Sequence, residues 1–163
     1  MVFVFGILIA GNFIIDGVRP YSSAAKAGLK KNDILVAVWG KHIKYSKMDT
    51  VIDELLGPKY SEVRIAVQKE IPVPVRDNGK DLYEELGVSL GFEYEGLVVK
   101  DVEPGKEGGS AGIEKGDFVI AIDGNTTRYM PIDGVIALIN SSGNNKEIAF
   151  TVRRTITLRR EGI

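Results

Sequence analysis

The chain has 163 residues, of which 44% are hydrophobic and 26% charged, so it can bury the core of one domain or of two small ones. Its 21 basic and 22 acidic residues leave no overall charge excess of the kind that favours nucleic acid or a membrane surface. Because it has no cysteine and one histidine, it can form no disulfide, thiolate zinc site or multi-histidine metal site. We therefore expect a binding protein without metal or cofactor.

The first predicted element is a hairpin near the start of the chain. Residues 2–15 form an apolar run that is interrupted by Gly6 and too short to cross a bilayer. The run lacks the basic start and the small-residue cleavage site of a signal peptide, so we expect no membrane insertion and a cytoplasmic protein. Gly11 and Asn12 both tolerate positive φ, and they predict a tight turn between two short strands.

The rest of the chain repeats itself at an offset of 84 residues. Residues 12–40 align with residues 96–124, with eight identities in 29 positions, where composition alone would give about two. Further along, residues 48–55 and 132–139 carry apolar side chains at the same helical spacing. The repeat predicts two copies of one structural unit.

Each copy is predicted to contain a strand, a short helical turn, a second strand, an amphipathic helix and two final strands. In the first copy these elements are expected at 13–18, 22–28, 34–38, 47–56, 62–68 and 71–76. In the second copy they are expected at 97–102, 108–112, 118–122, after Pro131, at 147–153 and at 156–161. Because strands outnumber helices, the expected fold class is α+β, mainly β with α. We expect two small antiparallel β-barrels or sandwiches, each with one short and one longer helix.

The boundary between the copies is predicted at DNGKD (77–81), which combines turn residues with charge. The expected domains are residues 1–76 and 84–163, joined by a linker at 77–83. Residues 1–80 carry 12 basic and 8 acidic side chains, a net +4, whereas residues 81–163 carry 9 and 14, a net −5. Chance divergence of solvated faces explains this difference as well as an electrostatic interface does. The short link and the opposite charges lead us to expect that the two modules dock on each other.

Two segments carry a family resemblance. VEPGKEGGSAGIEKGDFVIAIDG (102–124) resembles the central signature of PDZ domains, and VRPYSSAAKAGLKKNDILVAVWG (18–40) resembles it too, with Asn32 where Gly116 stands. The likeness covers nearly the whole chain as two tandem modules. It implies a non-catalytic protein–protein interaction module, a scaffold or adaptor that binds C-terminal tails or extended segments of other proteins by β-strand addition. Asp33 and Asp117 in the signature are expected to accept backbone N–H bonds in the turn before a strand.

The resemblance also implies a binding site in the second module. PDZ domains hold the ligand's carboxylate in a loop before their second strand, and the ligand lies between that strand and the long helix. ELGV (85–88) matches the loop, whereas the rival SLGF (89–92) leaves too few residues for a strand and turn. The implied carboxylate loop is Leu86, Gly87 and Val88, and the implied peptide groove is Ser89, Leu90, Phe92, Pro131, Val135 and Leu138. Pro131 stands where the family places a histidine that reads a hydroxyl, so we expect an apolar ligand residue two positions before the C-terminus.

The first module offers a weaker version of this site. VFGI (4–7) matches the loop, and the edge strand that follows at 7–10 is short. Because only three residues precede this loop, we expect the family's first strand to be missing or truncated in the first module. The implied first-module groove is Phe5, Gly6, Ile7, Lys47 and Val51. Because Lys47 brings a charge to a groove that needs an apolar wall, we expect this module to have weakened peptide capture and a mainly structural role.

Two alternative functions stay open. HtrA-like and C-terminal-processing proteases carry PDZ domains with a similar LGV loop, so the chain fits a non-catalytic regulatory fragment of such a protease. A GRASP-like membrane tether also has two adjoining PDZ modules. His42 follows a predicted strand with no acid beside it, and we do not expect it to act as a catalytic base. Arginines in RRTITLRR (153–160) alternate between strand faces and are expected to protect a solvated edge, with no nucleic acid as a partner.

Overall fold

The computed structural model describes residues 2–76, 81–142 and 146–160, with the backbone alone for residues 2–4. The chain divides into two compact units. Unit 1 comprises Met1–Lys69 and Arg154–Ile163, and unit 2 comprises Glu70–Arg153. Two long strands, β6 (Glu62–Pro74) and β11 (Glu147–Arg159), each contribute residues to both units.

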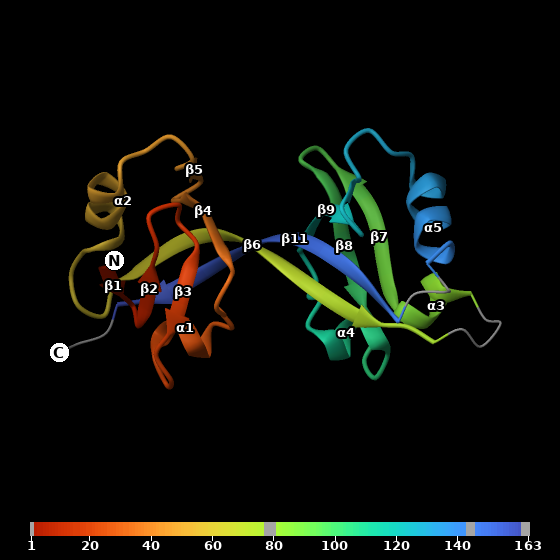
Figure 1. Ribbon diagram of the computed structural model, residues 1–163, viewed down its shortest axis with the longest axis horizontal. Helices are drawn as coiled ribbons and strands as arrows, with labels where there is room; N and C mark the ends of the chain where they lie inside the picture. Colours follow the sequence, from red (N-terminus) through yellow and green to blue (C-terminus); the bar gives the residue numbers. More distant parts are fainter. Residues whose placement is uncertain (1, 77–80, 143–145, 161–163) are drawn as a thin grey trace. The chain divides into compact units, whose positions relative to one another are not determined.

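Unit 1 is built from short strands, two helices and parts of β6 and β11 (Figure 1). Its remaining elements are β1 (Val2–Val4), β2 (Ile7–Ile9), β3 (Ile15–Val18), α1 (Ser23–Lys26), β4 (Ile34–Val38), β5 (Lys41–His42) and α2 (Met48–Leu55). Strands β1, β2 and β3 form an antiparallel sheet in that order, and β5, β4, β6 and β11 are successive neighbours in a second sheet. The core between them includes Ile7, Ile15, Val51 and Ile156.

Unit 2 repeats this plan, with a helix in the place that strand β1 takes in unit 1. Its elements besides β6 and β11 are α3 (Leu82–Leu86), β7 (Val88–Glu93), β8 (Gly96–Val102), α4 (Glu107–Ala111), β9 (Phe118–Ile122), β10 (Asn125–Thr126) and α5 (Ile132–Asn140). The sheet order is β6-β11-β9-β8-β7, with β10 paired to β9. Strand β7 therefore ends the sheet, and in the described part of the chain β8 is its one strand partner. The α+β prediction of antiparallel modules with a short and a longer helix is confirmed, and α3 is an unexpected further helix.

The final strands differ from the prediction. Residues 62–68 and 71–76 were expected to be separate strands, but 62–74 form the single strand β6, and 147–159 likewise form β11. Neither Lys69-Glu70 nor Arg154-Thr155, at the middle of each strand, is a turn-forming pair, so the backbone stays extended. Pro72 is tolerated within β6 because this strand lies at the edge of the sheet of unit 2.

The unit boundaries also differ from the expected domains 1–76 and 84–163. Ile71 and Val73 of β6 are buried in the core of unit 2, and Ile156 and Leu158 of β11 are buried in the core of unit 1. Each unit thus takes a strand from beyond the boundary predicted for it. Of the linker predicted at 77–83, residues 77–80 lie outside the described residues, whereas Leu82 and Tyr83 belong to α3.

No helix within the described ranges combines the length and the apolar character needed to span a membrane. Within the same ranges, no group of three or more His, Cys, Asp or Glu side chains is arranged to hold a metal ion.

Candidate peptide groove

Strands β2 and β7 hold equivalent positions in the two units. Each pairs with the strand that follows it, and in both pairs the register shifts at the same place, between Leu8 and Ile9 and between Ser89 and Leu90. The matching pairs are Ile7 with Val18 and Val88 with Val102, then Ile9 with Ile15 and Leu90 with Val99. Ile7 thus corresponds to Val88, and Ile9 corresponds to Leu90.

The outer edge of β7 presents backbone groups away from β8. The N–H of Glu103 donates to the carbonyl of Gly87 at 2.7 Å, so the N–H and carbonyl of Val88, the next residue, point to the opposite side. The N–H of Leu90 also points away from β8, because it donates to the hydroxyl oxygen of Tyr83 at 3.0 Å. Helix α5 contacts β7 and runs beside it (Figure 1). This edge therefore combines outward-facing backbone groups with a neighbouring helix.

Half-buried apolar side chains come from both β7 and α5. Leu90 of β7 and Leu138 of α5 are both half-buried and pack against the core of unit 2. Two other predicted groove residues, Val88 and Val135, are fully part of that core, being 4% and 0% exposed. The remaining predicted groove residues are exposed: Ser89 and Phe92 on β7 and Pro131, the N-cap of α5.

The predicted carboxylate loop is the end of a helix. Leu86 is the last residue of α3, and Gly87 ends the helix in the left-handed conformation, with φ at +66°. The N–H of Gly87 donates to the carbonyl of Glu84 at 3.2 Å, so it is already engaged within the turn. A Cβ at Gly87 would lie 2.7 Å from the Cβ of Lys106, which together with the positive φ requires glycine here. Of the three predicted loop residues, Val88 is the one whose N–H faces the outer edge of β7.

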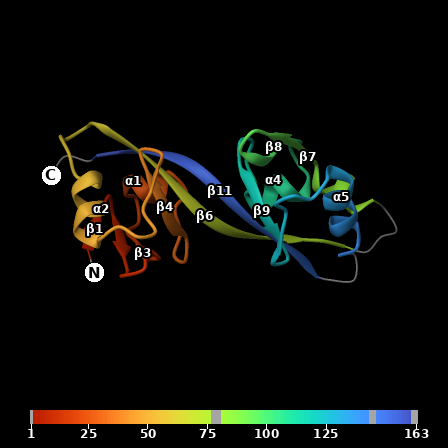
Figure 2. The ribbon, with the colours of Figure 1, turned by 90° about the horizontal axis from the view of Figure 1, so that it is seen from above.

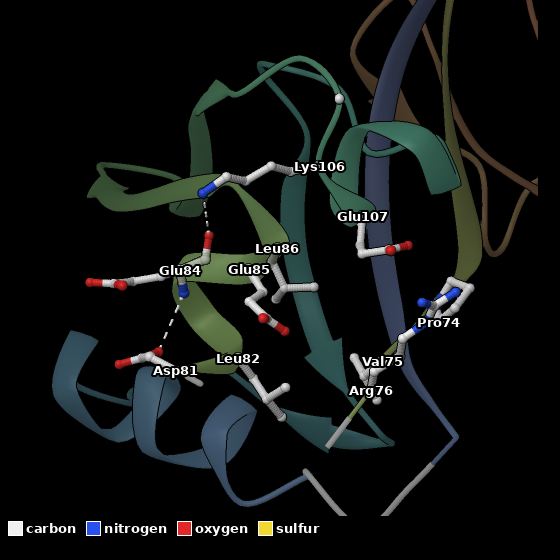
Figure 3. A pocket seen from close by; sticks show the side chains of 11 residues that line it. Pro74, Val75, Arg76, Asp81, Leu82, Glu84, Glu85, Leu86, Lys106 and Glu107 are labelled. Atoms are coloured by element: carbon white, nitrogen blue, oxygen red, sulfur yellow. Dashed lines mark hydrogen bonds between the residues drawn. The ribbon is translucent and has the colours of Figure 1, made fainter. Parts of the chain in front are cut away.

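Helix α3 is anchored at both ends. Asp81 caps its start by accepting the N–H of Glu84 at 3.3 Å, and the N–H of Tyr83 donates to Oδ1 of Asn140, at the end of α5, at 3.0 Å. Lys106 Nζ donates to the carbonyl of Glu84 at 3.1 Å, as Figure 3 shows. Sequence reasoning missed Tyr83, Lys106 and Asn140. The signal that could have found α3 is the spacing of Asp81 and Glu84, which is typical of a helix N-terminus.

Two hollows border α3. One, of about 580 Å³, is lined by α3 residues including Leu86, by Lys106 and by the end of β6, and holds no predicted residue of the groove proper (Figure 3). The other, of about 720 Å³, borders Gly87, Val88 and Ser89 together with Tyr83. Its other lining residues are Glu84, Lys106 and residues 101–104 at the end of β8 and just after it, so the hollow lies at the start of β7 and includes no residue of α5.

In unit 1 the equivalent edge is occupied by the chain itself. Strand β1 pairs with β2 on the side opposite β3 (Figure 1). Helix α2 contacts β1 (Figure 2). Phe5 and Gly6, both at positive φ, form the two-residue turn between β1 and β2, which is the geometry favoured in tight hairpins. Ile7 and Val51 are buried in the core, and Lys47 is the exposed N-cap of α2. Strand β1 therefore covers the edge where the first-module groove was predicted.

Comparison with known families places the same kind of domain on both halves of the chain. Two family models, each described as a PDZ domain, match residues 14–69 and 77–153.

Curated relatives and a solved structure are also similar to this chain. A probable periplasmic serine endoprotease, DegP-like, from Chlamydia pneumoniae is 28% identical over 91% of this chain, and one from Chlamydia trachomatis serovar D is 27% identical over 83%. The chain spans about a third of the length of these relatives, 34% and 31%. Among solved structures, a PDZ domain from choanoflagellate SHANK1 bound to a GIRK3 peptide aligns with a TM-score of 0.44 at 20% identity, covering 55% of this chain and 93% of that one.

Proposed function

Because this chain belongs to the PDZ domain family, with two PDZ domains in tandem, we propose that unit 2 captures extended peptide segments along the outer edge of β7. The chain is a protein–protein interaction module, and recognition by β-strand addition is the mode that this family uses. One observation carries the proposal: among the described residues β7 has no strand partner on its outer side, where the backbone groups of Val88 and Leu90 point outward beside α5. A ligand strand there gains backbone hydrogen bonds and apolar contact with Leu90 and Leu138.

The ligand class that we propose is an extended segment held mainly by its backbone, including the C-terminal tails of other proteins. Two features support backbone pairing over capture of a carboxylate. The N–H of Gly87 is engaged by Glu84, and Lys106 Nζ already contacts the carbonyl of Glu84 and lies 3.2 Å from Oε2 of Glu103. A ligand carboxylate at the loop would therefore find the N–H of Gly87 and the ammonium of Lys106 already engaged, with the N–H of Val88 as the outward donor. We still expect the ligand to place an apolar side chain beside the exposed Pro131.

The test is a titration of the whole chain with a pool of heptapeptides that carry apolar residues at the last and third-last positions. We expect NMR shift changes at 88–92 and at Leu138. Each peptide is tested as a free acid and as a C-terminal amide, because loss of a captured carboxylate would weaken binding by about tenfold or more. Because we propose binding mainly through the ligand backbone, we expect the amide to bind less than tenfold more weakly than the free acid. A pool that leaves every amide of β7 unshifted would refute the proposal.

A pair of variants on α5 makes the test specific to this groove. Leu138→Lys places a charge against the proposed apolar ligand side chain, whereas Ala137→Lys places the same charge on an exposed neighbouring position. We expect Leu138→Lys to weaken peptide binding by at least about tenfold, since the apolar contact contributes roughly 1.5–3 kcal/mol. The Ala137→Lys variant should bind like the unchanged chain.

The similarity to DegP-like proteins favours a second candidate function, a non-catalytic regulatory part of a serine endoprotease. Under either candidate, we propose that the 163 residues carry no chemistry of their own. The relatives are named as periplasmic enzymes, which gives the cytoplasmic expectation no support. Sequencing the reading frame on both sides of this segment separates the candidates, because a neighbouring Ser-His-Asp protease domain favours the regulatory one. The GRASP-like tether stays a prediction.

Docking of the two modules on each other, expected from the net charges of +4 and −5, also stays a prediction. Rotational diffusion measured by NMR relaxation tests it. One common correlation time that splits into two at high salt is the expected result, because salt screens the attraction. Two independent correlation times at low salt would contradict docking.

A further inference from the structure

We propose that Tyr83 occupies the ligand's place on β7 and thereby sets the peptide affinity of unit 2; this inference rests on the function proposed above. An added strand would use the outward N–H of Leu90 as a donor to one of its own backbone carbonyls. In the structure this N–H donates to the hydroxyl oxygen of Tyr83 at 3.0 Å. Since one N–H makes one strong hydrogen bond, a ligand carbonyl and the Tyr83 hydroxyl compete for it.

Tyr83 is held in this position by several contacts. Its side chain is half-buried against the core of unit 2, and its own N–H donates to Oδ1 of Asn140 at 3.0 Å. Helix α3, which carries it, is capped by Asp81 and contacts both α4 and α5. The hydroxyl therefore has few alternative positions, and its bond to Leu90 costs little conformational entropy.

Unit 1 gives independent support, because the equivalent edge there is also filled from within the chain. Ile9, which corresponds to Leu90, pairs with Val2 of β1. Both units thus cover the outer edge of the equivalent strand, unit 1 with a whole strand and unit 2 with one hydroxyl at Leu90. A single hydroxyl is much easier for a ligand to displace than a paired strand.

The consequence is a measurable penalty on peptide binding. The bond between Tyr83 and Leu90 stabilises the ligand-free state and is lost in the complex, so the binding-competent fraction of unit 2 is reduced. A net hydrogen bond of about 0.5–1.5 kcal/mol corresponds to a loss in affinity of about 3- to 10-fold. Because this bond exists in the free state alone, its removal should speed association and leave dissociation unchanged.

The experiment compares the whole chain with Tyr83→Phe and with the control Tyr45→Phe, which removes the hydroxyl of an exposed tyrosine in unit 1. The probe is the same heptapeptide pool. We expect Tyr83→Phe to bind about 3- to 10-fold more tightly through a faster association rate, with Tyr45→Phe unchanged. In the absence of peptide, hydrogen exchange at the Leu90 amide should be faster in Tyr83→Phe alone.

The outcomes separate this inference from the proposed function. If all three chains bind the peptides with equal affinity at 88–92, the function stands and the role of Tyr83 is refuted. Weaker binding by Tyr83→Phe would also refute it, because the hydroxyl would then contact the ligand. If no chain binds any peptide while Leu90 exchange responds as expected, the proposed function fails, and the role of Tyr83 in ligand affinity fails with it.

Discussion

At the scale of single residues, the repeated aspartates of the two units do the same work. Asp33 accepts the N–H of Lys30 at 2.9 Å, and Asp117 accepts the N–H of Glu114 at 3.0 Å, in the turn before β4 and β9. This confirms the structural role predicted for both. In unit 1 Asp33 also forms a buried ion pair with Lys69, whose Nζ donates to the carbonyl of Gly28 at 2.9 Å. Lys69 is 5% exposed, so this charge depends on Asp33 for compensation.

Removal of the Lys69 charge should destabilise unit 1. Lys69→Met leaves the carboxylate of Asp33 buried without its cation, and we expect the free energy of unfolding to fall by about 3 kcal/mol. Trp39, the one tryptophan of the chain, lies in unit 1, so its fluorescence during urea denaturation reports on that unit. Lys106→Met, at a more exposed lysine of unit 2, is the control and should leave the Trp39 transition unchanged. An unchanged midpoint in Lys69→Met would show that the pair contributes no net stability.

At the scale of elements, strands and helices were predicted correctly where the internal repeat and the spacing of apolar residues agree. The strands predicted at 34–38 and 118–122 coincide with β4 and β9, and α5 begins directly after Pro131 as its N-cap. The edge strand β7 follows instead from the PDZ resemblance, because ELGV (85–88) implies a strand that begins at Val88. Helix α3 was missed because five residues are too few for a helical period, although Asp81 marks its start. The ends of β6 and β11 were misplaced because their partners are set by tertiary packing, which the local pattern does not contain.

The loop glycines of both units are poor positions for test substitutions, because the backbone at these positions requires glycine. Gly6 and Gly87 have φ values of +86° and +66°, and a Cβ at Gly6 would overlap the side chain of Ser22. A bulky residue at either position strains the backbone of its own unit, so a loss of binding would not separate groove chemistry from misfolding. Side chains on α5 and the hydroxyl of Tyr83 are cleaner targets.

Deletion of residues 1–5 should open the groove of unit 1. This removes β1 and Phe5 of its turn, which exposes the outer edge of β2 at Ile7 and Ile9. We expect the number of heptapeptides bound per chain to rise from one to two in isothermal titration calorimetry. New NMR shifts should appear at 7–9 in addition to those at 88–92. Hydrogen-exchange protection at Val51 serves as the check that unit 1 stays folded. A folded variant that still binds one peptide would show that β1 does not block a second groove.

At the scale of the whole molecule, the two units are interdependent through exchanged strand segments. Residues 70–74 follow the first repeat in sequence but belong to unit 2. Residues 154–159 follow the second repeat but belong to unit 1. Backbone bonds pair β6 with β11 near both ends, between Tyr60 and Arg160 and between Val75 and Lys146. A fragment that begins at residue 78 would lack Ile71 and Val73 from the core of unit 2, so binding experiments require the whole chain.

Unit 1 should therefore depend on the last strand of the chain. Truncation after residue 153 removes Ile156 and Leu158 from its core, which costs roughly 3–6 kcal/mol of apolar burial. The truncation also removes Arg160, whose Nε donates to the carbonyl of Leu55 at 3.0 Å and whose guanidinium donates to Ser61 Oγ at 2.7 Å. Since a domain is stable by about 5–15 kcal/mol in total, we expect unit 1 of the truncated chain to be largely unfolded.

Amide hydrogen exchange tests this prediction separately in unit 1 and in unit 2. In chain 1–153, protection at Val51 and Val63 should be lost, whereas protection at Val119 in unit 2 should persist. A synthetic peptide of residues 152–160 added in trans should restore protection at the unit 1 sites, because it supplies the missing strand and its buried side chains. The same peptide with alanine in place of Leu158, which is fully buried, should restore much less. If chain 1–153 keeps full protection at Val51 without the peptide, residues 154–160 are dispensable and the exchanged strand does not hold unit 1 together.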